Sequence, residues 1–496
     1  MASILALDQG TTSSRALVLH QDGTVLAQAR REFPQHYPEP GWVEHDAEDL
    51  YASTIEAGRE ALAAAGERPA GIGITNQRET LVLWDRSTLR AVAPAIVWQD
   101  RRTAARCREL REAGTESEVR SRTGLLLDPY FTATKLEWLL RNPELRRRAE
   151  HGELAAGTVD SWLIARLSGG RAHVTDPTNA SRTMLFALAS GAWDRDLCTL
   201  FGVPGELLPT IVPSSGVCAE TDPGVFGVPL PIGGIAGDQQ AALFGQGCVA
   251  PGQAKNTYGT GAFLLLYTGS TPPAPPDGLL ATAACDPRGG LGFALEGSLF
   301  IAGAAIQWLR DGLGILREAG ESAAMAGSIP DTGGVSFVPA FVGLGSPHWE
   351  PEARGTITGL TRGTTREHLV RAALESMAFG SLELIETMLH STELALSSLR
   401  VDGGASANQW LMQFQADLLG VPVERPDNVE TTATGAAALA GLALGVWPSV
   451  GAVMEARRGT GFTPRMDQSE RSGRITEWKR AVGSALYWAR SRGGGV

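Results

Sequence analysis

Residues 5–26 read LALDQGTTSSRALVLHQDGTVL and carry the most informative pattern near the start of the chain. Three short apolar runs of strand length lie within or beside this stretch: Ile4–Asp8, Ala16–His20 and Val25–Ala29. The Asp22-Gly23 pair between the second and third runs is typical of a tight β-hairpin turn. We therefore expect the chain to begin with hairpin-connected strands.

The turn after the first run is strongly polar. Asp8 ends the run, and beyond Gly10 come four hydroxyl side chains and a cation: Thr11, Thr12, Ser13, Ser14 and Arg15. Two interpretations are open. The turn can be a hydroxyl-rich surface hairpin capped by Asp8. It can also be a phosphate site, in which Asp8 holds Mg²⁺ while hydroxyls, backbone amides and Arg15 meet phosphate oxygens.

Strand and helix patterns alternate after this opening. A helical pattern over Asp46–Ala65 precedes an apolar strand at Gly71–Thr75. Such alternation predicts the α/β class with mixed sheets. A chain of 496 residues exceeds one ordinary core, so we expect two domains, with Gln246–Gly252 as the hinge between them.

Glycine-rich turns return in the second half. Asn256–Gly261 reads NTYGTG and precedes the apolar run Ala262–Tyr267, which repeats the plan of the opening. This echo predicts an internal duplication, or else reflects the Gly-Thr turns common in α/β proteins. A later strand ends in Asp402-Gly403-Gly404 ahead of a helix, where backbone amides can approach a ligand. The sequence contains neither a P-loop motif nor a Rossmann fingerprint.

Composition narrows the class of protein. The net charge of −11 argues against nucleic acid as a partner. Five cysteines without C-x-x-C spacing are typical of reduced thiols rather than of disulfides or zinc. Each apolar segment is broken by Gly, Pro or charge before it reaches the length of a membrane span, so we expect no membrane insertion. A cytoplasmic enzyme is the expectation.

Several polar side chains suit a polyol. Arg78-Glu79 offers a fork of donors and one acceptor, Tyr130 adds a phenol, and Asp238 at a strand end can accept a proton from a hydroxyl. Each has a plainer alternative. Arg78-Glu79 can be an exposed ion-paired turn, Tyr130 can be an aromatic ring packed in the core, and Asp238 can be an N-cap of the following helix. Trp98 and Phe263 can likewise be core residues or pocket walls.

Longer motifs carry a family resemblance. They include ALDQGTTSSR from Ala6, PGWVEHD from Pro40, GITNQRET from Gly73, GIAGDQQAALFGQ from Gly234 and VDGGASANQWLMQFQAD from Val401. On these motifs the chain resembles the FGGY carbohydrate kinases of the actin-like ATPase superfamily, from about residue 4 to about residue 445. WVEHD, NQRET and GDQQAALFGQ are the specific ones, whereas single Gly-Thr turns are not.

The resemblance implies two actin-like (ribonuclease H-like) domains with mixed sheets around a central cleft. Residues 1–246 would carry the polyol site and the first phosphate hairpin, and residues 253–445 the second hairpin and the adenosine site, followed by a helical tail, 446–496. It further implies that ATP and Mg²⁺ serve to phosphorylate glycerol to sn-glycerol 3-phosphate, in glycerol uptake and catabolism.

Site residues follow from the motifs that match. The implied glycerol contacts are Arg78, Glu79, Tyr130, Asp238 and Gln239, with Trp98 and Phe263 against the carbon backbone. The implied nucleotide contacts are Thr11, Thr12, Ser13, Arg15, Thr260, Gly303, Gln307, Gly404 and Asn408. The implied catalytic set is Asp238 as base, Asp8 on the metal side and Arg15.

Alternatives remain within and outside the family. Another polyol or pentulose kinase is the nearest, and a non-metabolic actin-like ATPase is the one from a different class. The segment between Val217 and Ile235 contains no Lys or Arg. Many bacterial relatives have a basic loop here that binds fructose 1,6-bisphosphate, so we expect that regulation to be absent or different. A homo-oligomer, dimer or tetramer, is also expected.

Overall fold

The computed structural model describes residues 2–286, 290–455 and 458–493. The first three apolar runs form β1 (Ser3–Gln9), β2 (Ser13–His20) and β3 (Val25–Glu32), each antiparallel to the next. Gly23 has the positive φ of 87° that the turn between β2 and β3 requires. The predicted hairpin is therefore confirmed, and its pairing places Asp8 opposite Arg15.

The first large sheet has the order β13-β14-β5-β1-β2-β3, with β5 (Gly71–Asn76), β13 (Ser215–Glu220) and β14 (Pro231–Gly237). β5 runs parallel to both β1 and β14. Side chains at the carboxyl ends of β1, β5 and β14 therefore share one edge of the sheet. α1 (Ala47–Ala65) packs against β2 and β3, and Asp46 caps its start.

The second large sheet repeats this plan. Its order is β17 (Leu280–Cys285), β18 (Leu291–Leu299), β16 (Ala262–Gly269), β15 (Gln253–Tyr258), β21 (Ser398–Asp402), β22 (Val423–Pro426) and β23 (Gly459–Phe462). The run β18-β16-β15-β21-β22 has the same sequence of antiparallel and parallel pairings as β3-β2-β1-β5-β14. The echo in the sequence is thus a repeat of topology, and the α/β class with mixed sheets is confirmed.

Helices and short strands surround the two sheets. The first half adds α2 (Ala104–Glu112), α3 (Glu116–Thr123), α4 (Thr132–Leu139), α5 (Pro143–Glu150), α6 (Val159–Leu167), α7 (Pro177–Ala180), α8 (Arg195–Leu200), α9 (Pro223–Phe226) and α10 (Asp238–Gly245). The second half adds α11 (Gly303–Asp311), α12 (Glu321–Gly327), α13 (Arg366–His390), α14 (Gln409–Leu419), α15 (Thr431–Ala443), α16 (Val450–Glu455) and α17 (Gln468–Gly493). The short paired strands are β4 (Glu44–His45) with β7 (Ala95–Ile96), β6 (Val82–Asp85) with β8 (Leu154–Gly157), β9 (Val174–Thr175) with β12 (Thr210–Ile211), β10 (Phe186–Ala187) with β11 (Ala192–Trp193), and β19 (Ser336–Val338) with β20 (Thr356–Thr358).

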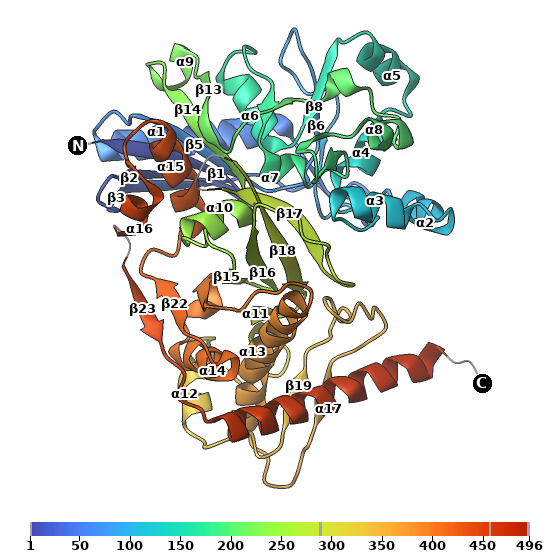
Figure 1. Cartoon of the computed structure of the whole chain (residues 1–496), viewed down its shortest axis with the longest axis vertical. Helices are drawn as coiled ribbons and strands as arrows, with labels where there is room; N and C mark the ends of the chain where they lie inside the picture. Colours follow the sequence, from blue (N-terminus) through green and yellow to red (C-terminus); the bar gives the residue numbers. More distant parts are fainter. Residues whose placement is uncertain (1, 287–289, 456–457, 494–496) are drawn as a thin grey trace.

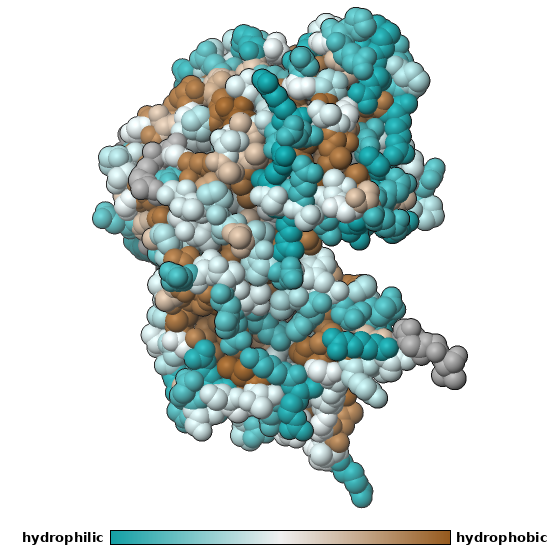
Figure 2. Space-filling model, turned by 45° about the vertical axis from the view of Figure 1, so that its right-hand side comes forward, coloured by the Kyte–Doolittle hydropathy of each residue, from teal (hydrophilic) through white to brown (hydrophobic). Residues whose placement is uncertain are grey.

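The chain forms two lobes, with the N-terminus in one and the C-terminus in the other (Figure 1). Its surface is hollowed on one side between them (Figure 2). The predicted hinge, Gln246–Gly252, is the connection from α10 to β15. Within the described residues, no helix is both long enough and apolar enough to cross a membrane.

The helices α15 and α16 of the second half lie in the first lobe (Figure 1). α15 packs on β1, β5 and β14, and its alanines share a hydrophobic cluster with Ile4 and Ala6. The approach is so close that a Cβ added at Gly73 would lie 2.1 Å from the carbonyl oxygen of Ala436. Small residues on both partners make this contact possible.

The last part of the chain contains a strand as well as helices. Residues 446–496, expected to be a helical tail, contain α16 and α17 but also β23, which pairs with β22 at the edge of the second sheet. Trp478 of α17 stacks on Phe379 of α13 at 5.1 Å between ring centroids. Residues 456–457 and 494–496 of this segment lie outside the described residues.

Candidate active site

Arg78 and Glu79 follow the carboxyl end of β5 and are almost fully buried. Arg78 Nη1 and Nη2 donate to the two carboxylate oxygens of Glu296 on β18, at 2.6 and 3.2 Å. Arg78 Nε lies 3.1 Å from Asp238 Oδ1. Arg78 therefore joins the centre of the first sheet to the second sheet and to the start of α10, which excludes the exposed turn considered above.

Glu296 and Arg182 extend these contacts into a buried ring of charges. Arg182 Nε donates to Glu79 Oε1 at 2.6 Å, and Arg182 Nη2 donates to Glu296 Oε1 at 3.0 Å. Burial favours a raised pKa for Glu296, but Arg182 and Arg78 outweigh it and lower that pKa to about 2. Burial raises the pKa of Glu79, against the pull of the same two arginines. The ring holds two carboxylates and two guanidinium groups, so each charge has a partner.

Asp238 is the first residue of α10, and the N-cap of that helix is Gly237. The N-cap interpretation of Asp238 is therefore wrong. Its side chain is 33% exposed, and Oδ1 faces Arg78 while accepting the backbone N–H of Gln239 at 2.7 Å. A carboxylate held by an arginine at a partly open position is suited to meet a substrate hydroxyl.

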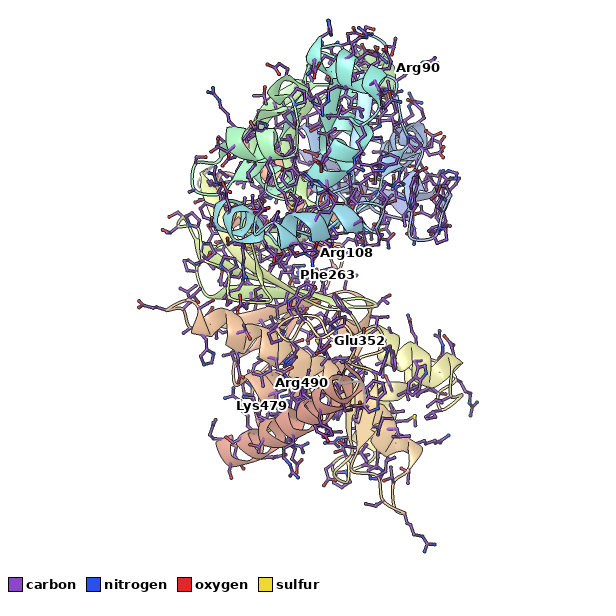
Figure 3. All side chains as sticks on the ribbon, turned by 90° about the vertical axis from the view of Figure 1, so that its right-hand side faces the viewer. Arg90, Arg108, Phe263, Glu352, Lys479 and Arg490 are labelled. Carbon is purple, nitrogen blue, oxygen red and sulfur yellow. The ribbon has the colours of Figure 1, made fainter. Side chains whose placement is uncertain are left out.

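Aromatic side chains form a wall beside the charged ring. Trp98 and Tyr130 meet edge to face with centroids 5.5 Å apart, and the Arg182 guanidinium lies 5.8 Å from the Tyr130 ring. Trp98 Nε1 donates to Thr11 Oγ1 at 2.9 Å, which connects this wall to the first phosphate hairpin. Phe263 on β16 is partly exposed and lies at the height of the junction between the lobes (Figure 3).

Lys135 of α4 anchors the backbone under this wall. Its ammonium donates to the carbonyl oxygens of Glu79, at 3.1 Å, and of Tyr130, at 2.8 Å. Glu79 has a positive φ of 62°, which is uncommon for a residue with a side chain, so its conformation needs such support. Complete burial lowers the pKa of Lys135 to about 7.

Gln239 follows Asp238 on α10 and is half-buried. Its Oε1 accepts a hydrogen bond from Lys255 Nζ of β15, and the same ammonium donates to Thr257 Oγ1 at 2.8 Å. Burial lowers the pKa of Lys255, while Asp402 and Asp238 counteract that effect.

Asp8 is the last residue but one of β1, next to this group, and is 2% exposed. Arg15 bridges two carboxylates, because Nη2 lies 3.0 Å from Asp8 Oδ2 and Nη1 lies 2.6 Å from Glu430 Oε2. Burial raises the pKa of Asp8 to about 6, although Arg15 opposes the shift. In the described part of the chain, Asp8 Oδ2 has no aligned hydrogen-bond donor despite its burial.

Asp8 Oδ2 is ion-paired with Arg15 but accepts no aligned hydrogen bond, so this carboxylate can also hold a cation. The described ranges contain no group of three or more His, Cys, Asp or Glu side chains that could enclose a metal ion. An isolated carboxylate beside a hydroxyl-rich turn fits Mg²⁺, which keeps much of its water and is shared with phosphate oxygens.

The two predicted phosphate hairpins have turns of the same length, residues 10–12 and residues 259–261. In the first, the Gly10 N–H donates to the Ser13 carbonyl at 3.0 Å, Thr12 is exposed, and Ser13 Oγ accepts from Arg30. In the second, the exposed Thr260 accepts the N–H of Ala302 on its carbonyl at 2.8 Å. Gly303 approaches so closely that an added Cβ would lie 2.6 Å from the Gly259 carbonyl. The fold thus brings Thr260 and Gly303 together.

The remaining nucleotide candidates lie on α11 and near α14. Gln307 is exposed on α11. Gly404 is exposed at the start of a 3-10 turn, Gly404–Ala407, where an added Cβ would meet nothing within 4 Å. Asn408 caps α14 by accepting the Leu411 N–H at 3.0 Å, and its amide donates to Ser322. Roles for these residues in nucleotide binding stay predictions.

Five charged residues of the site were missed from the sequence: Lys135, Arg182, Lys255, Glu296 and Glu430. Glu296 is a lone acid in the apolar strand LGFALEGSL, and a buried charge requires a partner, so that pattern contained a usable signal. Arg182 and Glu430 carry no comparable local pattern.

Arginines from other parts of the chain contact the segment Val217–Ile235, which has no Lys or Arg of its own. Arg59 Nε donates to the Val225 carbonyl at 2.8 Å, and Arg171 Nη1 lies 3.7 Å from Asp222 Oδ2. Whether fructose 1,6-bisphosphate regulates the protein stays a prediction.

Family models match most of the chain, up to residue 444. The N-terminal domain of the FGGY family of carbohydrate kinases matches residues 3–245, and the C-terminal domain of the same family matches residues 254–444. These two matches agree with the resemblance drawn from the motifs.

Curated relatives extend over nearly the full length. Glycerol kinase from Alkalilimnicola ehrlichii is 56% identical, covering 99% of both chains. Glycerol kinase 2 from Thermotoga maritima is 52% identical, covering 98% of this chain and 99% of its own. Among solved structures, Plasmodium falciparum glycerol kinase with ADP superimposes with a TM-score of 0.94 at 33% identity, covering 98% of each chain. Xylulose kinase from Lactobacillus acidophilus, at 20% identity and a TM-score of 0.89, shares the fold.

Proposed function

Because the chain belongs to the FGGY family of carbohydrate kinases, we propose that it transfers the terminal phosphoryl group of ATP to glycerol, giving sn-glycerol 3-phosphate. Full-length relatives named glycerol kinase at 52–56% identity support glycerol as the substrate. The observation that carries the proposal is the cluster of Arg78, Glu79 and Asp238, with Arg78 Nε 3.1 Å from Asp238.

The polyol would bind through paired donors and acceptors. Each hydroxyl can donate one hydrogen bond and accept others. Arg78 and Glu79 offer a donor beside an acceptor, and Gln239 and Asp238 offer a second such pair. Trp98, Tyr130 and Phe263 would cover the carbon atoms. A substrate that lacks one of these hydroxyls would leave buried polar groups unpaired, which weakens its binding strongly.

Proton transfer falls to Asp238. Its carboxylate is partly open to the site, whereas the Glu79 carboxylate is held by Arg182. As the terminal hydroxyl attacks the γ-phosphorus, Asp238 takes its proton, an effect typically worth about 10²–10⁴-fold in rate. The Arg78 guanidinium keeps the Asp238 side chain turned toward the hydroxyl.

ATP would lie across the two hairpins. Thr11, Thr12 and Ser13 of the first turn and Thr260 of the second present hydroxyls and backbone amides. Gly303, Gln307, Gly404 and Asn408 would contact the rest of the nucleotide. Asp8 would hold Mg²⁺, which neutralises charge on the phosphates when it is bound. Arg15, held between Asp8 and Glu430, supplies a further positive charge.

A comparison of substrates tests the proposal. ADP release would be followed in a coupled assay with glycerol, xylulose, ribulose and erythritol as alternative acceptors. We expect kcat/KM to be at least about 100-fold higher for glycerol, since a site built to bind specific hydroxyls discriminates strongly. A preference for a pentulose would point to another member of the family, and ATP hydrolysis that ignores polyols would point to an actin-like ATPase.

Assembly and location are further parts of the proposal. We expect a homodimer or homotetramer that works in the cytoplasm in glycerol uptake and catabolism. Light scattering coupled to gel filtration measures the mass in solution, and a monomer at micromolar concentration would contradict the assembly.

A further inference from the structure

Lys255 is a buried cation that the proposed chemistry does not use. It lies on β15 in the second sheet with no exposed surface. Its ammonium donates to Oε1 of Gln239, across the boundary between β15 and α10. The side chains of Lys255 and Gln239 therefore connect the strand before the second phosphate hairpin to the helix that begins with Asp238.

The contact between Lys255 and Gln239 determines which way the Gln239 amide points. An ammonium group has three donors and no acceptor, whereas the Gln239 amide has an oxygen that accepts and a nitrogen that donates. Lys255 therefore selects the orientation in which Oε1 faces it and Nε2 faces away. Within the described ranges no acceptor contacts Gln239 Nε2.

The orientation of the Gln239 amide matters because Asp238 precedes it on α10. As a carboxylate, Asp238 can only accept hydrogen bonds from a substrate hydroxyl. A hydroxyl between Asp238 and Gln239 gives its proton to Asp238, so a second acceptor at Gln239 would be left without a donor. A donor at Gln239 instead completes the pair, as Arg78 does beside Glu79.

We propose that Lys255 is a positioning residue that orients the Gln239 amide so that Nε2 donates to the substrate hydroxyl facing Asp238. This inference rests on the proposed function. It assigns a role in the polyol site to the second sheet, through Lys255. A purely structural role for Lys255 as a buried ion is the alternative that the test must exclude.

The test compares the KM for glycerol with the KM for ATP in four variants: Lys255→Met, Gln239→Ala, the double variant and Gln239→Glu. Loss of one neutral hydrogen bond predicts a rise of roughly three- to tenfold in the glycerol KM for Lys255→Met. The ATP KM should change less than about twofold. If Lys255 acts through Gln239, the double variant should match Gln239→Ala, because the two effects are not independent.

Gln239→Glu separates orientation from stability. A glutamate keeps a partner for Lys255, so the melting temperature should not fall, but it removes the donor and raises the glycerol KM by at least about tenfold. Thr257→Val is the matched control. It removes the other partner of Lys255 while leaving Gln239 in place, and its glycerol KM should stay within about twofold.

Any of four results would overturn the inference. Three of them are multiplied effects in the double variant, equal rises in both KM values for Lys255→Met, and an unchanged glycerol KM in Gln239→Glu. A rise in Thr257→Val equal to that in Lys255→Met would do the same. The wild-type substrate preference tests the proposed function separately. If another polyol is preferred, the variants are compared with that polyol, since the donor requirement concerns a hydroxyl in either case.

Discussion

Arg78 has five N–H donors, and most of them are already engaged. Nε faces Asp238, Nη1 faces Glu296 and Gln240, and one N–H of Nη2 faces Glu296. One N–H of Nη2 remains for a ligand within the part of the chain that the structure describes. Arg78 therefore orients Asp238 as much as it binds substrate, so its removal should affect kcat as well as KM.

Asp238→Asn isolates the proton acceptor. The amide keeps the shape of the side chain but cannot take a proton, so we expect kcat to fall by about 10²–10⁴-fold. The glycerol KM should change less than about fivefold, because Arg78, Glu79 and Gln239 remain. Steady-state kinetics with saturating ATP measure both values, and a kcat close to wild type would remove Asp238 from the role of base.

Glu296→Gln tests the buried ring. The substitution leaves Arg78 and Arg182 with one carboxylate fewer, and unbalancing a buried ion pair costs about 3–5 kcal/mol. Urea unfolding should show that loss together with a higher glycerol KM. Glu48→Gln is the control, because the Arg166–Glu48 pair is half exposed and worth at most about 1 kcal/mol. Equal losses in the two variants would argue against a special role for the ring.

Asp160 predicts a pH dependence of stability. It accepts hydrogen bonds from Thr158 and Thr175, and burial raises its pKa to about 7. The folded state binds the Asp160 proton more tightly than the unfolded state does. The contribution of Asp160 to the free energy of unfolding is therefore complete below about pH 4 and is lost as the pH rises through about 7.

Asp160→Asn removes that titration. From about pH 5 to about pH 8, the wild type should lose roughly 1–3 kcal/mol more of its free energy of unfolding than the variant does. Urea unfolding at both pH values measures the difference. Parallel pH profiles for the two proteins would show that Asp160 is ionised throughout.

At the scale of elements, α10 and α15 set the position of the site. α10 presents Asp238 and Gln239 at its first turn, and its middle touches α15, where a Cβ at Gly435 would lie 1.9 Å from the Ala241 carbonyl. The two helices can approach this closely only because glycine occupies the contact. Any widening there would move α10 relative to Arg78.

Gly435→Ala should therefore destabilise the protein by about 2–3 kcal/mol and lower kcat/KM for glycerol. Gly483→Ala on α17 is the matched control, since nothing lies within 4 Å of its added Cβ. Alanine is the better helix former, so this variant should gain about 0.5–1 kcal/mol. Thermal unfolding and steady-state kinetics compare them, and a neutral Gly435→Ala would show that α10 and α15 can separate without cost.

At the scale of the whole molecule, the lobes do not coincide with two continuous halves of the chain. α15 belongs to the second half but covers β1, β5 and β14 of the first sheet. Glu430 just before α15 also pairs with Arg15 of β2 at 2.6 Å. A ligand that contacts Arg15 at the first hairpin would therefore affect the Arg15–Glu430 pair, which lies at the start of α15, a helix of the second half.

A fragment of residues 1–246 should not fold alone. It would expose the apolar sheet face that α15 covers in the full chain, and exposed patches of that kind lead to aggregation. We expect an insoluble fragment, or a soluble one without cooperative thermal unfolding. Calorimetry with the full chain as control measures this, and a sharp transition in a monomeric fragment would refute the expectation.

Much of the fold could be predicted from the sequence. The opening strands, α1 and the strand before Arg78 follow from apolar runs, a helical period and turn residues within about twenty positions. The pairing of Arg78, Glu79 and Asp238 was also expected, from the motifs. Lys255, Glu296 and Glu430 were not, because a charge in a strand or at a helix start does not indicate which distant residue faces it.

Interactions between near neighbours therefore follow from local chemistry: Gly23 permits a hairpin turn, and Asp46 starts a helix. The electrostatics of the site do not follow from local chemistry. Arg78 meets Glu296 across 218 positions, and Arg15 meets Glu430 across 415. The energy of a buried charge depends on the distance to its partner and on exclusion of water. Both quantities are settled by strand order and helix packing, so they emerge only when the whole chain has folded.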